Sequence, residues 1–307
     1  MRAVGIEWFG GDVRELSLPD PRPPRPGETL IAVRAAAVAP WDDLVRLGSW
    51  DVGLRPPAAL GVSASGTVAA VGADDGWSVG DEVMTHPVPM LEQGCWSELL
   101  LTRADLLARK PTAVSWGEAA AFPVPALTAD QALQAAIGDS PPGKLLVHGA
   151  GGVTGQLIAA SAVAVGAEVV ATAGPRSAER LRELGIGAVL DYHDDDWSTE
   201  VREWAGGDGV PAAINAAPGG EGDALSAVAD GGRLATITGV PPSPERGVTI
   251  ADVYVEADAH RLERMGERLG NGEVGISVGE TYGLAEAAEA LRVAVGGAGG
   301  DAVVLNV

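Results

Sequence analysis

The pattern of hydrophobic and polar positions changes near Ser115. Before it, short runs of β-prone residues such as Thr29–Val38 and Thr67–Val71 are separated by turn signals at Pro26-Gly27 and Val79-Gly80. This spacing is typical of a small barrel-like β domain.

After Ser115 the pattern predicts alternating helices and strands. Ser115-x-x-Glu118 before an Ala-rich run predicts a capping box that opens a helix. The apolar run Lys144–His148 predicts a buried parallel strand, which a glycine-rich loop, an apolar helix and a strand at Glu168–Ala173 follow as one βαβ unit. The alternation continues with Arg176–Leu184 and Ala188–Leu190, Trp197–Ala205 and Val210–Asn215, and Glu221–Val228 and Arg233–Thr238. It predicts a doubly wound parallel sheet.

The last part of the chain returns to a different order. A helix is expected at Ala259–Leu269, and from Ile276 a strand, a helix and a final strand at Ala302–Val307 follow.

The loop after the strand Lys144–His148 carries a candidate phosphate site. It has the spacing Gly149-x-Gly151-x-x-Thr154 and opens a helix, which is the context that a dinucleotide-binding fingerprint requires. The first glycine permits a tight turn, the second lets backbone N–H groups approach a pyrophosphate, and the helix N-terminus favours negative charge. Thr154 stands where a third glycine is expected, with Gly155 next. The alternative is a tight turn in an α/β protein that binds no nucleotide.

The end of the second strand favours NADPH over NADH. NAD sites carry a carboxylate about 20 residues after the first glycine, where it holds the ribose 2′-OH. The stretch Thr172–Ser177 has none and offers Arg176 and Ser177, a guanidinium and a hydroxyl that would accept a 2′-phosphate. The alternative is that these two residues only begin a surface helix.

Charge and composition exclude several classes of function. The 21 Lys and Arg residues against 42 Asp and Glu give a net charge of −21, which disfavours binding to nucleic acid or anionic membranes. The apolar stretch Leu157–Val170 is too short to span a membrane. The single cysteine, Cys95, excludes an internal disulfide and suits a reducing compartment. We therefore expect a soluble, cytoplasmic protein.

Other catalytic motifs are missing from the sequence. Tyr192, Tyr254 and Tyr282 lack a lysine four residues on, and neither a Gly-x-Ser-x-Gly elbow nor a P-loop is found. Asp194–Asp196 is interpreted as the N-cap of the helix that begins at Trp197.

A series of short motifs carries a family resemblance. In chain order they are Ala39-Pro-Trp-Asp42, Leu60–Gly72, Val79-Gly-Asp-Glu-Val83, Gly94-Cys-Trp-Ser-Glu98, Val147–Val153, Glu183-Leu-Gly185, Val189–Tyr192, Gly231–Leu234 and Leu284–Ala290. Together they resemble the medium-chain dehydrogenase/reductase superfamily, in its zinc-independent quinone oxidoreductase-like branch, over nearly the whole chain.

The resemblance implies an α/β fold with two domains. Residues 1–115 and 276–307 would form a GroES-like β-barrel catalytic domain, and residues 116–275 a Rossmann domain with a doubly wound parallel sheet. It also implies a homodimer, for which the edge strand at Val248–Val255 is the candidate interface.

The resemblance further implies that no metal is bound. Zinc-dependent relatives have a cysteine where this chain has Ala39 and a His-Glu pair where it has Val62 and Ser63. The chain also departs from its own branch, because Ala39 replaces the usual asparagine and Trp50 replaces the tyrosine of a Gly-x-Tyr stretch.

Site residues follow from the resemblance and from residue chemistry. Asp42, Ser63 and His86 are candidate catalytic residues, with roles in the turn, the backbone or the core as alternatives. Trp41, Trp50 and Trp96 are candidates to shape the substrate pocket, with the barrel core as the alternative. The expected cofactor contacts are Thr128, Gly149, Gly151, Gly152, Val153, Thr154, Arg176, Ser177, Tyr192, Asn215, Thr238 and Gly239.

We therefore expect a zinc-independent NADPH-dependent oxidoreductase that reduces quinones or α,β-unsaturated carbonyls by hydride transfer to a small-molecule electron acceptor. Two alternatives stay open. One is an enoyl reductase that tailors a polyketide-like metabolite, and the other is a non-catalytic NADPH-binding or sensor protein.

Overall fold

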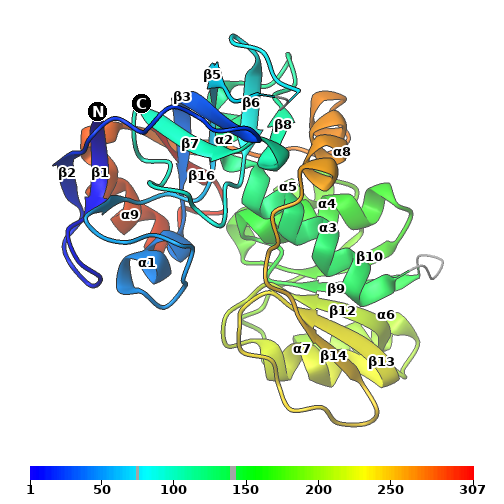
Figure 1. Cartoon of the computed structure of the whole chain (residues 1–307). Helices are drawn as coiled ribbons and strands as arrows, with labels where there is room; N and C mark the ends of the chain where they lie inside the picture. Colours follow the sequence, from blue (N-terminus) through cyan, green and yellow to red (C-terminus); the bar gives the residue numbers. More distant parts are fainter. Residues whose placement is uncertain (74–75, 139–142) are drawn as a thin grey trace. The chain divides into compact units, whose positions relative to one another are not determined.

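The computed structural model describes residues 1–73, 76–138 and 143–307, and the chain divides into two compact units (Figure 1). Unit 1 contains Met1–Val124, Glu256–Gly272 and Ile276–Val307, and unit 2 contains Pro125–Val255 and Glu273–Gly275. Helices α2 (Trp116–Ala121) and α8 (Ala259–Gly270), which we expected in the Rossmann domain, belong to unit 1.

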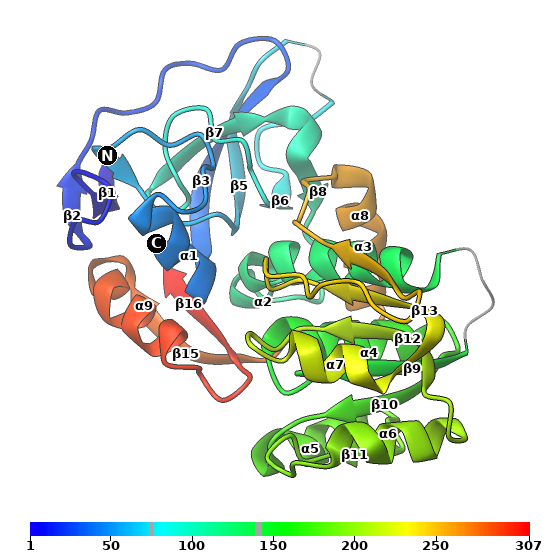
Figure 2. The same ribbon diagram turned by 90° about the horizontal axis from the view of Figure 1, so that it is seen from below.

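Unit 1 is built on a largely antiparallel sheet in the order β15-β16-β3-β5-β6-β8, with β7 also paired to β3 and a small sheet β2-β1-β4. The last strand of the chain, β16, pairs with β3 and so joins the two ends of the chain in one sheet (Figure 2). The strands are β1 (Arg2–Ile6), β2 (Arg14–Ser17), β3 (Glu28–Val38), β4 (Ala58–Ala59), β5 (Ala64–Val71), β6 (Glu82–Thr85), β7 (Leu99–Arg103), β8 (Leu107–Arg109), β15 (Val278–Gly283) and β16 (Ala302–Asn306).

Packing explains why α2 belongs to unit 1. Its predicted capping box is confirmed, because the Ser115 hydroxyl accepts the N–H of Glu118 and the Glu118 carboxylate accepts the N–H of Ser115. Ala120 and Ala121 then pack against Ala35 and Val304 in the core of the sheet. The other helices of unit 1 are α1 (Pro40–Leu47), α9 (Ala287–Val295) and the short 3₁₀ turns η1 (Ala104–Leu106) and η2 (Leu284–Glu286).

Helix α8 is held by contacts that are distant in the sequence. The Glu263 carboxylate accepts the N–H of Arg109 at 2.7 Å. A Cβ on Gly266 would lie 2.6 Å from Cε of Met84, so a larger residue here would displace the end of the Met84 side chain.

Unit 2 is a six-stranded parallel sheet in the order β11-β10-β9-β12-β13-β14 (Figure 1). Numbered from its own first strand, this is the 3-2-1-4-5-6 order of a Rossmann fold, so the predicted doubly wound sheet is confirmed. Its elements are α3 (Pro123–Ile137), β9 (Lys144–His148), α4 (Val153–Ala164), β10 (Glu168–Thr172), α5 (Pro175–Glu183), β11 (Ala188–Leu190), α6 (Trp197–Ala205), β12 (Val210–Asn215), α7 (Glu221–Ala227), β13 (Val228–Thr236) and β14 (Thr249–Asp252).

One core cluster of unit 2 joins the sheet to helices α6 and α7. It contains Leu146, Val170 and Ala213 from the strands, Trp197 from α6 and Leu225 from α7. Strand β14 lies at the edge of the sheet, within the predicted Val248–Val255, and pairing across a two-fold axis stays a prediction. Within the described ranges, no helix is both long enough and apolar enough to cross a membrane.

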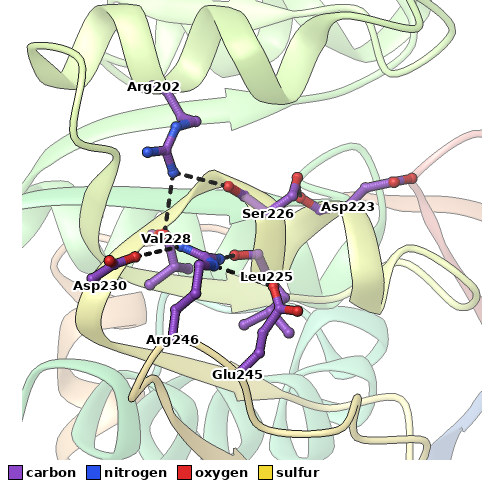
Figure 3. Close-up of polar contacts among 8 residues, drawn as sticks. All are labelled: Arg202, Asp223, Leu225, Ser226, Val228, Asp230, Glu245 and Arg246. Atoms are coloured by element: carbon purple, nitrogen blue, oxygen red, sulfur yellow. Dashed lines mark hydrogen bonds and ion pairs between the residues drawn. The ribbon is translucent and has the colours of Figure 1, made fainter.

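Two arginines hold the C-terminus of α7 (Figure 3). Arg246 donates to the carbonyls of Leu225 at 2.7 Å and Val228 at 2.6 Å, and it pairs with Asp230. Arg202 donates to the carbonyl of Ser226 at 3.1 Å. The last carbonyls of a helix lack intrahelical donors, so these arginines fix the end of α7.

Candidate functional site

The glycine-rich loop between β9 and α4 depends on the absence of side chains at two positions. Gly149 has a φ of 80°, and a Cβ there would lie 2.8 Å from the N atom of Ala217. A Cβ on Gly155 would lie 2.2 Å from the carbonyl oxygen of Gly149. Gly155, one position beyond the Thr154 that stands at the fingerprint's third place, therefore supplies the close packing of the third glycine.

The N-terminus of α4 is open to an anion. Gly152 is its N-cap, and no side chain caps the helix. The first N–H groups of a helix lack intrahelical acceptors and carry a partial positive charge. The nearest atom to a Cβ on Gly152 would be the Gly149 carbonyl oxygen at 3.9 Å, so the backbone here is uncrowded. This cradle fits the pyrophosphate of a dinucleotide.

Several side chains brace the loop, and of these the sequence analysis named only Ser177 as a site residue. The Thr172 hydroxyl accepts the N–H of Gly149 at 3.0 Å and lies 2.7 Å from Nδ1 of His148. Gln156 donates from Nε2 to the carbonyl of Gly151 at 3.0 Å, and the Ser177 hydroxyl donates to the same carbonyl at 3.3 Å. The position of Thr172 as the last residue of the strand next to the glycine loop could have pointed to this role.

His148 is buried at the end of β9 and contacts both Thr172 and Trp197. Its ring stacks on Trp197 with centroids 4.5 Å apart and an interplanar angle of 11°. Burial lowers the pKa of His148, against the opposing charges of Asp223 and Glu221, and so keeps the ring neutral.

The residues expected at the adenosine end lie close together. Gly174 caps α5 without a side-chain hydrogen bond, and Arg176 and Ser177 follow in its first turn, with Arg176 exposed. A Cβ on Gly174 would lie 3.5 Å from Cε1 of Tyr192, whose ring lies against His193 with centroids 4.0 Å apart. The segment that follows β11 thus contacts the start of α5.

A buried network of hydrogen bonds runs along the carboxyl ends of β12 and β13. Asn215 accepts the N–H of Ala217 at 3.1 Å and donates to the Thr236 hydroxyl at 3.3 Å. The Thr236 and Thr238 hydroxyls are 2.9 Å apart, and Thr238 donates to the Glu221 carboxylate at 2.6 Å.

The carboxylate of Glu221 connects this hydrogen-bond network to the start of α7. Burial alone would raise the pKa of Glu221, but hydrogen bonds from the Thr238 hydroxyl and the Gly219 N–H outweigh it and lower the pKa. Glu221 is a site residue that the sequence analysis missed. Two other residues were predicted to contact the cofactor. Gly239, with a φ of 74°, directly follows Thr238 of this network, and Thr128 is buried in α3.

The catalytic candidates of unit 1 are buried polar groups. Asp42 accepts the N–H of Ala39 at 2.8 Å, and burial raises the pKa of Asp42 to about 8, against the N–H groups of Ala39 and Val62. Nδ1 of His86 lies 2.7 Å from the carbonyl oxygen of Val62, and burial lowers the pKa of His86 to about 4. Both side chains are therefore uncharged near neutral pH and contact the same stretch of backbone.

Ser63 and two of the tryptophans have defined structural contacts. The Ser63 hydroxyl donates to the carbonyl of Ala120 at 2.7 Å and ties the barrel to α2. Trp96 is fully buried and donates to the carbonyl of Ala37, which places it in the barrel core and not on a pocket wall. Trp50 lies 6.2 Å from His86 between ring centroids, and Trp41 is half-buried on α1.

The residues at the zinc positions of zinc-dependent relatives are poor ligands. Ala39 and Val62 have no donor atom, and the Ser63 hydroxyl is engaged by Ala120. Over residues 1–73, 76–138 and 143–307, no group of three or more His, Cys, Asp and Glu side chains is placed to hold a metal ion. Cys95 is buried, and burial raises the pKa of its thiol, with the nearby Asp42 charge adding to the rise.

Two family models match the chain, the first within unit 1 and the second mostly within unit 2. The alcohol dehydrogenase GroES-like domain matches residues 25–112. The zinc-binding dehydrogenase model matches residues 153–266, which include α4 and most of the parallel sheet.

Among curated proteins, the chain is similar to segments of polyketide synthases. It is 36% identical to erythronolide synthase EryA2 of Saccharopolyspora erythraea over 201 residues, 64% of this chain and 5% of the synthase. It is 34% identical to the mycocerosic acid synthase-like polyketide synthase of Mycobacterium tuberculosis over 234 residues, 74% of this chain and 11% of that protein. The chain thus spans about a tenth or less of these relatives.

Solved structures match the whole chain. An NAD-dependent alcohol dehydrogenase has a TM-score of 0.90 at 29% identity, and a mycobacterial quinone oxidoreductase has a TM-score of 0.84 at 28% identity, each over 100% of both chains. A mycobacterial protein solved in complex with NADPH has a TM-score of 0.85 at 27% identity, again over 100% of both chains. With the matched domains, the Rossmann strand order and the glycine cradle, these likenesses show that the chain is an oxidoreductase of the medium-chain dehydrogenase/reductase superfamily, with a nicotinamide dinucleotide-binding Rossmann domain.

Proposed function

We propose that this protein is a zinc-independent, NADPH-dependent reductase of quinones and α,β-unsaturated carbonyls. The observation that carries the proposal is the cradle at β9 and α4, where an uncapped helix N-terminus meets glycines that leave room for a pyrophosphate. Gly151, Gly152, Val153 and Thr154 would hold that group through their backbone.

The preference for NADPH rests on the start of α5. The related structures include one described as NAD-dependent and one complexed with NADPH, so the chain's own residues decide the preference. Arg176 supplies an exposed guanidinium, and the end of β10, Thr172 to Gly174, has no carboxylate to bind a ribose 2′-OH. The Ser177 hydroxyl donates to the Gly151 carbonyl at 3.3 Å and would have to rotate to donate to a 2′-phosphate.

When bound, NADPH supplies a hydride. The chain's part is to hold the dinucleotide and to support the acceptor, whose oxygen gains negative charge as its carbon is reduced. Asn215 and Thr238, fixed through Thr236 and Glu221, would position the nicotinamide end. Trp50, which stands where the branch has a tyrosine, is no proton acid, and we assign the proton that completes the reduction to solvent.

The relatives favour a second candidate, an enoyl reductase that acts on a polyketide-like thioester. The observation behind it is the similarity of this chain to polyketide synthases at 34% and 36% identity. The two candidates share the hydride step and differ in the acceptor.

Oxidation of NADPH and NADH, followed by the absorbance of the reduced nicotinamide, tests these functions against a quinone, a simple enone and a 2-enoyl thioester. The proposal expects turnover of the quinone and the enone with NADPH, whereas thioester turnover alone would favour the second candidate. Binding of NADPH without turnover of any acceptor would contradict both and favour a sensor.

The variant Arg176→Ala tests the preference for NADPH. Loss of charge-assisted hydrogen bonds worth about 1.5–3 kcal/mol would weaken NADPH binding about 10- to 100-fold and leave NADH binding unchanged. Arg182→Ala, an exposed arginine later in the same helix, is the matched control and should change neither. Equal losses for both dinucleotides in Arg176→Ala would contradict the assignment.

A further inference from the structure

A histidine at the adenosine end is held in one orientation by a carboxylate. Oδ1 of Asp191 accepts the backbone N–H of His193 at 3.1 Å and lies 2.6 Å from Nδ1 of the same residue. An ionised carboxylate only accepts hydrogen bonds, so Nδ1 carries the hydrogen. In the neutral ring, Nε2 is then the atom with the lone pair.

The imidazole reaches the segment proposed to bind the 2′-phosphate. Strands β10 and β11 are parallel neighbours, and the Ala173 N–H donates to the Leu190 carbonyl at 3.0 Å, so Asp191 to His193 run beside the start of α5. A Cβ on Gly174 would lie 3.9 Å from Cε1 of His193. The His193 side chain is 61% exposed and therefore accessible to a ligand.

The partner of this ring is an ionised carboxylate. Hydrogen bonds from the His193 backbone and then from its side chain lower the pKa of Asp191. Tyr192 lies against the ring, the acidic residues Asp194–Asp196 follow His193 directly in the sequence, and Arg176 lies two residues beyond Gly174 at the start of α5. The negative charge of Asp191 would repel a phosphate unless a cation neutralises that charge. His193 is the side chain that pairs with Asp191.

We propose that His193 is a specificity-determining residue that binds the adenosine 2′-phosphate of NADP(H) as an imidazolium. The inference rests on the proposed function and names a further determinant of its cofactor preference. Nδ1–H stays on Asp191, and a proton from solvent is taken up at Nε2, which then donates to a phosphate oxygen. Binding of NADPH is therefore coupled to proton uptake, whereas binding of NADH, which lacks the 2′-phosphate, is not.

Calorimetric titration in two buffers of different ionisation enthalpy measures this proton uptake. The titrations use NADPH and NADH with the wild type and His193→Asn, whose amide can still donate to Asp191 but cannot become a cation. His260→Asn, at an exposed histidine on α8, is the matched control. The 2′-phosphate has its own pKa of about 6, so the titrations are run above it and each variant is compared with the wild type.

The wild type and His260→Asn should take up a proton with NADPH and none with NADH. In His193→Asn the uptake should vanish, and NADPH binding should weaken about 10-fold at unchanged NADH affinity, as expected for one charged hydrogen bond. Unchanged proton uptake and an unchanged NADPH-to-NADH affinity ratio in His193→Asn would overturn the role of His193 alone. Failure of the wild type to bind either dinucleotide would overturn the proposed function and this inference together.

Discussion

Replacing Gly155 with alanine tests the packing that shapes the phosphate loop. The new Cβ would lie 2.2 Å from the carbonyl oxygen of Gly149 and 2.9 Å from Cα of Ala150. Both neighbours are backbone atoms of the loop itself, so rotation of a side chain cannot relieve the overlap.

Two effects of opposite sign determine the size of the change. Overpacking of this kind typically destabilises by about 1–3 kcal/mol. Alanine in a helix gains about 1 kcal/mol over glycine, and Gly155 lies in the first turn of α4, where part of that gain applies. We expect a net loss of about 1–2 kcal/mol in the free energy of unfolding. The displaced loop should also weaken NADPH binding by at least about 10-fold, equivalent to about 1.4 kcal/mol.

Chemical denaturation and NADPH titration by tryptophan fluorescence measure the two quantities. Gly222→Ala in α7 is the matched control, because a Cβ there has no neighbour within 4 Å, and it should leave binding unchanged and stability equal or higher. Gly152→Ala separates the two effects, since its Cβ meets no protein atom closer than 3.9 Å but would enter the phosphate cradle. It should keep its stability and lose affinity. A Gly155→Ala protein with wild-type stability and affinity would refute the reasoning.

Three further changes test other parts of the structure. Arg246→Met removes one donor from the carbonyl of Leu225 in α7 and one from the carbonyl of Val228, which follows α7. These carbonyls keep the N–H of Val228 and the guanidinium of Arg202 as other donors, so we expect a loss of about 1–2 kcal/mol in the free energy of unfolding; a loss below about 0.5 kcal/mol would contradict its capping role. Asp42 has a folded-state pKa raised from 3.8 to about 8, so its neutral form stabilises the fold at low pH and this stability is lost as pH rises from about 4 to about 8. Relative to Asp42→Asn, the wild type should lose about 1.4 kcal/mol per pH unit across this window in denaturation experiments, and parallel pH profiles would argue against a protonated carboxyl. Trp96→Phe loses the hydrogen bond to Ala37 inside the core and should lower the thermal midpoint in calorimetry, with a loss of about 1–3 kcal/mol; an unchanged midpoint would show that this carbonyl finds another donor.

Local sequence determined the elements of unit 2 closely. The strands at Lys144–His148, Ala188–Leu190 and Val210–Asn215 and the helix at Trp197–Ala205 begin and end where the pattern predicts. Each is a short apolar run or an amphipathic stretch bounded by turns, so its signal lies within a few neighbouring positions.

Long-range packing explains the main differences in the fold. Helix α8 is assigned to unit 1 by contacts such as Glu263 with Arg109, which lie 154 positions apart. No local pattern contains that information. The role of Gly155 likewise depends on the path of the loop back over Gly149, and not on spacing alone. Asp196 is the N-cap of α6, as predicted, but its side chain makes no capping hydrogen bond, because its backbone is not extended (φ −104°, ψ 5°) and the N3 N–H of Thr199 donates to the Asp196 carbonyl instead.

The candidate site could be found from the sequence only in part. The glycine loop, Arg176 and Tyr192 were identified from motif and resemblance, and the structure places Tyr192 beside the start of α5. Thr172, Glu221 and the Asp191–His193 pair were not. Thr172 and Glu221 bond to residues that are distant in the sequence, and the pair matters only through its place beside the start of α5. Polar side chains that support a site from a different element lie at no fixed distance from it in the sequence, so no motif identifies them.

The most direct test of the central claim follows the hydride itself. The protein is incubated with NADPH carrying deuterium at the transferred C4 position and with an α,β-unsaturated ketone, and the product is examined by mass spectrometry and NMR. The account predicts one deuterium at the β-carbon of the saturated ketone, and much slower labelling with NADH labelled in the same way. Consumption of NADPH with no deuterium on that carbon, or no reduction of any acceptor by a protein that binds NADPH, would contradict it.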